Sequence, residues 1–291
     1  MPDAASLLSL SNELADLVER VAPGIVALHG ARRWPLSGIH WRPGVIVTAE
    51  EGLEHDEGLS LVLPDGRKVE ASLAGRDPTT DIAVLRFQPD GLKTVQLGDA
   101  AALRAGNLVI AIGRNEAGPV AGFGVAALAG GAWQSRSGGT IDRLIRLDLR
   151  LSPSGEGGAL VDMAGRVLGM TVPGPRRRVL AIPASTIDRV TDQLLAKGYI
   201  ARGYLGAGLR PVRHGARGVL IVSIDPSGPA VSAGLLVGDI ITQWNGEDVA
   251  RMRGILQLLG PDSVGKPVKL SLSRGGTAIE KTITIGERPR S

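Results

Sequence analysis

Residues 75–85 read Gly-Arg-Asp-Pro-Thr-Thr-Asp-Ile-Ala-Val-Leu, a polar turn that leads directly into an apolar stretch. Apolar runs bounded by turn residues predict β-strands. Runs of the same kind recur on both sides, and they predict strands at 45–48, 59–63, 82–87, 108–112, 144–149, 167–172 and 179–182. Many short strands at regular spacing are typical of barrels and sandwiches. We therefore expect a mostly β domain before residue 183.

Helical patterns precede and follow this β region. Apolar side chains recur at helical spacing from Ser11 to Val21, after a Ser-Asn pair that favours the start of a helix. A second helix is predicted for 183–197, because Gly198 occupies the position where glycine commonly ends helices. Further strand patterns and one amphipathic helix, around 249–259, follow. We expect an N-terminal segment (1–22), a larger domain (23–199) and a smaller domain (200–288).

The composition is that of a globular protein with two domains. The 291 residues suffice for about two cores, and the hydrophobic fraction of 43% is ordinary. The absence of cysteine excludes disulfides, thiol nucleophiles and cysteine zinc sites. No apolar run approaches the ~18 residues that span a bilayer, and the N-terminal residues lack the basic start and apolar stretch of a secretory signal. We therefore expect a cytoplasmic protein without a membrane partner.

The basic character of the chain raises the question of nucleic acid. The net charge is +4, but aromatic residues make up only 3% of the sequence and no basic run is interleaved with them. The longest basic run, Arg176-Arg177-Arg178, is interpreted as a solvated loop. Nucleic acid is therefore not an expected partner.

Two stretches resemble parts of a known protease family. The stretch at 75–85 resembles the segment that carries the catalytic aspartate in the HtrA family of trypsin-like serine proteases, and places Asp81 at that position. Residues 45–53, Val-Ile-Val-Thr-Ala-Glu-Glu-Gly-Leu, are similar to the family's strand and turn ending in Thr-Asn-Asn-His-Val-Val. On that register Glu51 stands at the histidine position. The resemblance implies a mostly β fold, a chymotrypsin/trypsin-like double β-barrel.

A third stretch resembles the family's nucleophile loop. Residues 152–161 read Ser-Pro-Ser-Gly-Glu-Gly-Gly-Ala-Leu-Val, where the usual form is Asn-Pro-Gly-Asn-Ser-Gly-Gly-Pro-Leu-Val. Glu156 stands at the serine position, and Gly155 is assigned to an oxyanion-hole position.

The replaced residues decide the expected chemistry. Acyl transfer by a serine triad needs a hydroxyl to attack, an imidazole to carry the proton and a carboxylate to orient the imidazole. Only the carboxylate, Asp81, remains, and losing a triad member costs about a millionfold in rate. The sequence therefore predicts a pseudoprotease without peptidase activity.

Three alternatives to an inactive cleft stay open: a bound cation, glycosidase chemistry and an active protease with a displaced triad. Glu51, Asp81 and Glu156 would repel one another, so they would have to share a proton, recruit an arginine or bind a divalent cation. The cation is a minor alternative, because two glutamates tolerated in an inactive cleft are the simpler interpretation, and no cofactor or metal is expected. Paired acids also allow glycosidase chemistry, but the aromatic platforms usual for sugars are missing. In an active enzyme with a displaced triad, His55 and either Ser152 or Ser154 would replace the missing residues.

The C-terminal part resembles a PDZ domain of the HtrA type. The segment 202–209, Arg-Gly-Tyr-Leu-Gly-Ala-Gly-Leu, resembles the carboxylate-binding loop and first strand, and residues 226–246 match the turns and strand that follow. The resemblance implies a small α+β domain, a partly open barrel, that binds peptides or protein C-termini by strand addition. The expected peptide-binding residues are Tyr204, Leu205, Gly206, Ala207, Leu209, Ile255, Leu258 and Leu259.

Two classes of function follow from these resemblances. The first is a pseudoprotease that captures peptides, protein C-termini or unfolded protein through its PDZ domain. The alternative is an active HtrA-type serine endopeptidase in protein quality control. Family members often form trimers through aromatic residues near the N-terminus, and residues 1–33 contain none. A homo-oligomer is therefore left open.

Overall fold

The computed structural model describes residues 4–29, 36–89, 91–135, 137–212, 218–249 and 252–289. The chain forms two compact units. One unit consists of Met1–Ser135 with Thr140–Tyr199, and the other of Arg136–Gly139 with Ile200–Ser291. No helix among the described residues is long and apolar enough to cross a membrane.

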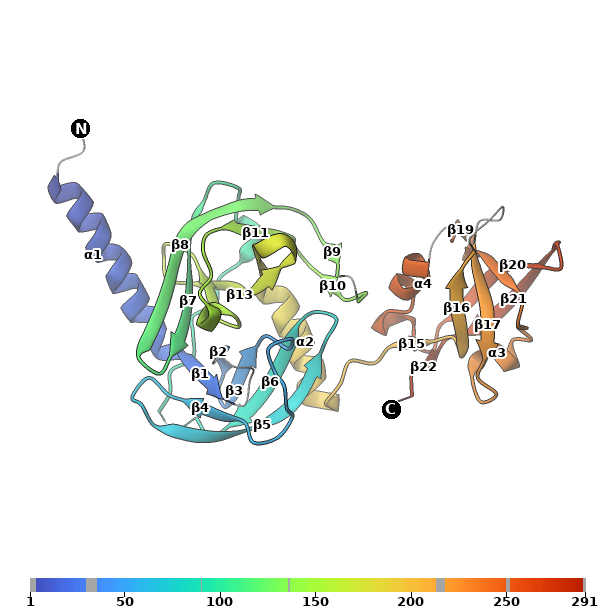
Figure 1. The fold of residues 1–291 in the computed structure, drawn as a ribbon, viewed down its shortest axis with the longest axis horizontal. Helices are drawn as coiled ribbons and strands as arrows, with labels where there is room; N and C mark the ends of the chain where they lie inside the picture. The colour runs from blue at the N-terminus through green and yellow to red at the C-terminus, as the bar shows by residue number, and fades with distance from the viewer. Residues whose placement is uncertain are drawn as a thin grey trace. The chain divides into compact units, whose positions relative to one another are not determined.

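The first unit begins with a closed six-stranded barrel (Figure 1). Around the barrel the strands are β1 (Ile25–His29), β2 (Leu36–Arg42), β3 (Val45–Thr48), β6 (Ile82–Phe87), β5 (Lys68–Asp77) and β4 (Ser60–Val62). Its interior is filled by fully buried aliphatic side chains such as Leu28, Ile46 and Leu85. Strands β3 and β6 are the predicted strands at 45–48 and 82–87. They pair with Thr48 opposite Ala83, which brings the end of β3 next to the start of β6.

A second closed barrel follows in the same unit. Around it the strands are β11 (Ile145–Asp148), β14 (Arg178–Pro183), β13 (Val167–Gly174), β12 (Ala159–Val161), β7 (Leu108–Asn115) and β8 (Gly118–Ala129). Buried Val109, Ile145 and Leu160 contribute to its core. A two-stranded pair, β9 (Trp133–Gln134) and β10 (Thr140–Ile141), lies outside the barrel. The two closed barrels confirm the predicted double β-barrel.

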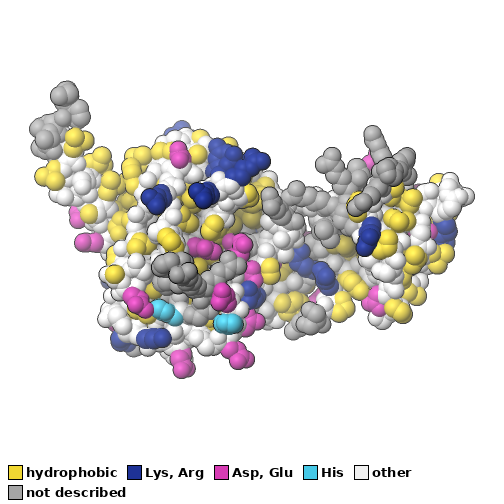
Figure 2. Space-filling view, viewed as in Figure 1, with side chains coloured by type: hydrophobic (Ala, Val, Ile, Leu, Met, Phe, Trp, Pro, Cys, Tyr) yellow, Lys and Arg dark blue, Asp and Glu magenta, His cyan; other side chains and the backbone are white. Residues whose placement is uncertain are grey.

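Two helices accompany the barrels. Helix α1 (Ala4–Val21) begins before the predicted start at Ser11, so that start is wrong. Only its C-terminal part packs on the unit (Figure 2), where Leu17 and Val21 are buried. Helix α2 (Ala184–Lys197) is confirmed, and Gly198 ends it in the left-handed conformation with φ 78°.

The second unit is built on one antiparallel sheet. Its order is β16 (Ala207–Pro211), β17 (Val219–Ile224), β18 (Ile240–Trp244), β20 (Pro267–Arg274) and β21 (Thr277–Thr284), with β19 (Glu247–Asp248) paired to β18. The short strands β15 (Gly203–Tyr204) and β22 (Gly286–Glu287) form a separate pair, and two helices, α3 (Pro229–Ser232) and α4 (Met252–Leu258), complete the unit.

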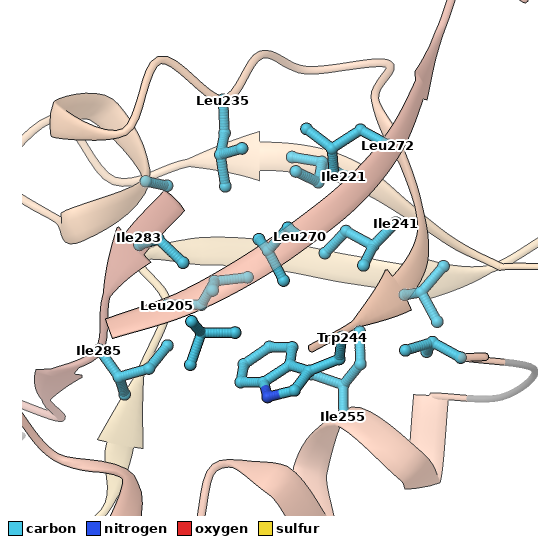
Figure 3. Packing of buried hydrophobic residues seen from close by; sticks show 14 residues of the cluster. Leu205, Ile221, Leu235, Ile241, Trp244, Ile255, Leu270, Leu272, Ile283 and Ile285 are labelled. Atoms are coloured by element: carbon cyan, nitrogen blue, oxygen red, sulfur yellow. The ribbon is translucent and has the colours of Figure 1, made fainter. Parts of the chain in front are cut away.

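The core of this unit lies between the sheet and helix α4. Figure 3 shows Trp244 and Ile255 facing each other there, with Leu205, Ile241 and Leu270 around them. The fold agrees with the small α+β domain expected for the C-terminal part.

Candidate functional site

The first two residues of the expected triad region lie where β3 ends and β6 begins. Glu51 follows β3 and Asp81 precedes β6. The backbone N–H of Glu51 donates a hydrogen bond of 2.8 Å to Asp81 Oδ1. Asp81 has φ 58°, a left-handed conformation that aspartate tolerates better than most residues. The turn thus holds the Asp81 carboxylate against the residue at the histidine position.

The loop that carries Glu156 is fastened to the first barrel by Ser37. The N–H of Ser37 donates to the Glu156 carbonyl at 2.9 Å, and its hydroxyl donates to the Ser154 carbonyl at 2.5 Å. The Ser37 hydroxyl also accepts the N–H of Arg114 at 2.7 Å. From the second barrel, the Thr171 hydroxyl donates to the Gly155 carbonyl at 2.8 Å. Fully buried Ser37 therefore fixes the backbone on which the Glu156 side chain stands.

The approach of this loop to β2 requires glycine at one position. Gly157 has φ 75°, and a Cβ atom there would lie 2.3 Å from the Ser37 carbonyl oxygen. Any larger residue would both strain the backbone and push the loop away from Ser37. The close packing of the loop is thus kept although its nucleophile is absent.

The electrostatics of the cleft are dominated by negative charge. The pKa of Asp81 is raised from 3.8 to about 7, mainly by burial and also by the charges of Glu156, Glu51 and Glu50, against the lowering effect of the Glu51 N–H. Near neutral pH, Asp81 therefore holds a proton for part of the time. A proton on Asp81 relieves part of the repulsion among the acidic side chains of the cleft.

An arginine is recruited nearby, but by a residue that the sequence analysis did not single out. Glu50 is only 8% exposed and accepts a hydrogen bond of 2.6 Å from Arg76 Nε. The same guanidinium donates to Asp56 at 2.7 Å. Arg76 lies in the stretch at 75–85, yet no spacing in the sequence connects it to Glu50. The charge of Glu50 is thus compensated by Arg76.

The remaining candidates of the cleft take other positions. The N–H of Gly155, assigned to the oxyanion hole, donates to the Ser152 carbonyl at 2.9 Å. His55 is exposed, and among the described residues no hydrogen bond joins it to Asp81, Ser152 or Ser154. Within the described part of the chain, no group of three or more histidine or acidic side chains is arranged to hold a metal ion.

The expected carboxylate-binding loop of the second unit is rigidly supported. The Tyr204 hydroxyl donates to Asp225 at 2.7 Å, so this side chain braces the loop. The carbonyls of Leu205 and Gly206 accept hydrogen bonds of 2.9 Å from Ala230 and Asp225. In contrast, the N–H groups of Leu205 and Gly206 donate to no partner within the described ranges. The loop therefore presents unpaired amides, as a carboxylate-binding site requires.

The apolar residues expected around this loop divide into two groups. Leu205 and Ile255 are 2% and 0% exposed, which makes them part of the core. The others are half-buried and pack against that core: Ala207, Leu209, Leu258 and Leu259. Strand β16 forms one edge of the sheet and pairs only with β17 among the described strands. The structure thus provides an unpaired strand edge with half-buried apolar side chains next to the amides.

Both halves of the chain match known families. Residues 36–170 match the trypsin-like peptidase domain, and residues 203–285 match the PDZ domain. A probable periplasmic serine endoprotease, DegP-like, from Halomonas elongata is 32% identical over 268 residues, which cover 85% of this chain and 55% of that protein. A relative of the same description from Bartonella henselae is 33% identical and is covered to 52%. The chain spans about half the length of the curated relatives it matches.

Solved structures show the same architecture. The serine endoprotease from Yersinia pestis superposes with a TM-score of 0.75 at 26% identity, covering 94% of this chain and 98% of that one. An HtrA-type protease, AlgW, solved with a decapeptide superposes with a TM-score of 0.75 at 23% identity, covering 95% and 99%. These similarities confirm the fold in both units.

Proposed function

We propose that this chain is a peptide-binding pseudoprotease. It is an HtrA/DegP-like protein with a trypsin-fold peptidase domain and a C-terminal PDZ domain. Its PDZ domain captures peptides, protein C-termini or exposed ends of unfolded proteins. Its peptidase domain binds or assembles without cleaving.

The loss of activity is supported by the residues at the two positions where the chemistry would occur. A carboxylate at Glu156 is a far weaker nucleophile toward a peptide than an activated serine, and Glu51 cannot carry a proton as an imidazole does. Asp81 keeps the position of the orienting carboxylate, but no imidazole stands at position 51 for it to orient. The cleft therefore lacks both halves of the proton relay.

The alternative is an active HtrA-type endopeptidase in which other residues replace the missing pair. It would require His55 to reach Asp81 and a serine of the loop. His55 is exposed, Ser154 is 8% exposed, and no hydrogen bond among the described residues joins them. The geometry gives this alternative no support.

The observation that carries the binding function is the pair of unpaired amides at Leu205 and Gly206 beside the free edge of β16. We infer that a peptide's terminal carboxylate binds these amides, while its backbone pairs with β16. Its last side chain would then lie against Leu209 and the half-buried leucines of α4, Leu258 and its neighbour Leu259.

This binding is tested with fluorescent peptides that end in an apolar residue. We expect a peptide with a free carboxylate to bind at least about tenfold more tightly than the same peptide with an amide end. Gly206→Ala should abolish the difference, since a Cβ at Gly206 would lie 2.7 Å from the Gly228 Cα. Gly246→Ala is the matched control, because Gly246 has φ 84° with nothing within 4 Å of the added carbon. Equal binding of both peptides would refute the proposal.

The absence of catalysis is tested by cleavage of an unfolded, casein-like substrate. The natural chain should not cleave the substrate at any protein concentration. A Glu51→His/Glu156→Ser version is assayed in parallel. Cleavage by the natural chain that a serine-directed inhibitor blocks would favour the displaced triad.

The location is a separate proposal. The sequence predicts the cytoplasm, whereas the relatives are named periplasmic. Fractionation of cells that express the full-length protein decides between them, with a tagged cytoplasmic enzyme and a tagged periplasmic one as markers.

A further inference from the structure

The hairpin between β13 and β14 ends in three consecutive arginines. Arg176, Arg177 and Arg178 are all exposed. Within the described ranges, none of the three forms an ion pair with a carboxylate. Other arginines of this unit are engaged: Arg76 binds Glu50 and Arg114 binds backbone carbonyls. The tip therefore concentrates positive charge that the chain itself does not neutralise.

The backbone of this tip is strained. Arg176 has φ 58° and ψ 39°, and Arg177 has φ 58° as well. Residues with a Cβ adopt this left-handed conformation at a cost, so two in succession are unusual, and glycine or asparagine would serve the turn better. The short connection between the paired residues Gly174 and Arg178 accounts for this conformation, because tight hairpin turns need residues with positive φ.

The strand register places Arg176 and Arg177 away from the acidic residues of the neighbouring strands. The last paired residues of β13 and β14 are Gly174 and Arg178. On the other side, Leu147 of β11 pairs with Val179, which brings Asp148 beside Arg178. Arg176 and Arg177 lie beyond the last pair, where no neighbouring strand supplies a carboxylate.

We propose that Arg176 and Arg177 bind acidic side chains of a polypeptide held by the peptidase domain. Guanidinium groups match carboxylates in paired hydrogen bonds. Nucleic acid is disfavoured because residues 171–183 contain no aromatic side chain on which a base would stack. The proposal rests on the proposed function only in treating this domain as a binding unit, and it does not involve the PDZ domain.

The test uses the full-length protein and a fluorescent hexaglutamate peptide with an amide end, which removes the terminal carboxylate that the PDZ domain would capture. Arg176→Gly/Arg177→Gly should weaken binding about tenfold at low salt. Because glycine relieves the left-handed strain, the melting temperature should stay the same or rise. A variant that was merely damaged would lose both binding and stability.

A matched control removes two positive charges elsewhere on the same unit. Lys68 and Arg104 are both exposed, and Lys68→Gln/Arg104→Gln should bind hexaglutamate as the natural chain does. An equal loss in both double variants would show non-specific attraction and overturn the proposal. Tighter arginine-dependent binding of duplex DNA than of hexaglutamate would overturn it in favour of nucleic acid. If the free-carboxylate peptides described above do not bind while hexaglutamate still does, only the PDZ proposal is refuted.

Discussion

Asp81→Asn is expected to stabilise the peptidase domain above neutral pH, although it alters a residue in the candidate site. The carboxyl of Asp81 is half-buried among the charges of Glu50, Glu51 and Glu156, and its pKa is raised to about 7. In the unfolded chain it titrates near its ordinary value of 3.8. The favourable contribution of the protonated form is therefore complete below about pH 4 and is lost as the pH rises through about 7.

The magnitude follows from the difference between the two pKa values. One pKa unit corresponds to about 1.4 kcal/mol, so the difference from 3.8 to about 7 sets an upper limit of about 4 kcal/mol. Because the carboxyl is partly open to solvent, we expect about 2 kcal/mol. Asparagine cannot ionise, still accepts the Glu51 N–H through its carbonyl, and tolerates the left-handed backbone. The variant should thus be about 2 kcal/mol more stable than the natural chain at about pH 8 and equally stable at about pH 4.

The assay is native-state hydrogen exchange read by mass spectrometry at both pH values. Peptides from β3 and β6 report on the peptidase domain, and peptides from the second unit serve as an internal control. Asp65→Asn is the matched variant: the Arg67 backbone N–H lowers the pKa of Asp65, so its contribution is present above the ordinary pKa and lost as the pH falls. That substitution should not stabilise at high pH. If Asp81→Asn destabilises β3 and β6 at about pH 8, the surroundings of Asp81 stabilise its ionised carboxylate instead of penalising it, and our electrostatic reasoning is wrong.

Three further substitutions test other parts of the structure. Ser37→Ala leaves the Ser154 carbonyl without its donor, and should cost about 2 kcal/mol in urea unfolding. Asp239→Ala leaves Arg274, bound at 2.7 Å, without its buried acid, and should cost about 3 kcal/mol, with increased hydrogen exchange confined to the second unit. Burial lowers the pKa of His40, so the natural chain loses stability as the pH falls through the ordinary value of 6.5; His40→Leu should flatten this decline in urea unfolding.

The sequence could predict the elements whose pattern is set by burial. The strands at 45–48 and 82–87 are apolar except for Thr48 and Arg86 and belong to a barrel, and their limits agree with the structure. Strand β8 was not predicted, because it alternates glycine with exposed residues and only Ala126 along it is fully buried. Helix α1 begins earlier than predicted because Leu7 and Leu8 continue the helix while remaining exposed, at 57% and 63%. A prediction based on the spacing of buried apolar residues cannot locate a helix end that is exposed to solvent.

Some features of the candidate site could be predicted from the sequence, and others could not. Glu51 and Asp81 were assigned from the resemblance of residues 45–53 and 75–85 to motifs of the HtrA family, and the structure places them at the end of β3 and the start of β6. The supporting role of Ser37 could not be expected, because it comes from a hydroxyl that bonds to a residue more than a hundred positions away. The pairing of Arg76 with Glu50 was missed as well, because it joins two different segments of the first barrel. Long-range hydrogen bonds depend on how barrels close, which no local spacing records.

The loop geometry also limits what restoring the triad can show. Glu51→His/Glu156→Ser returns two side chains, but the Gly155 N–H still donates to Ser152 and the Ser154 carbonyl is still held by Ser37. Releasing one such hydrogen bond costs about 1 kcal/mol, or roughly a fivefold loss of rate for each donor that must turn toward a substrate. Weak cleavage by the restored version would therefore reflect the closed loop, whereas inertness of the natural chain would follow from its missing hydroxyl and imidazole. Only the natural chain's behaviour bears on whether this protein is a protease.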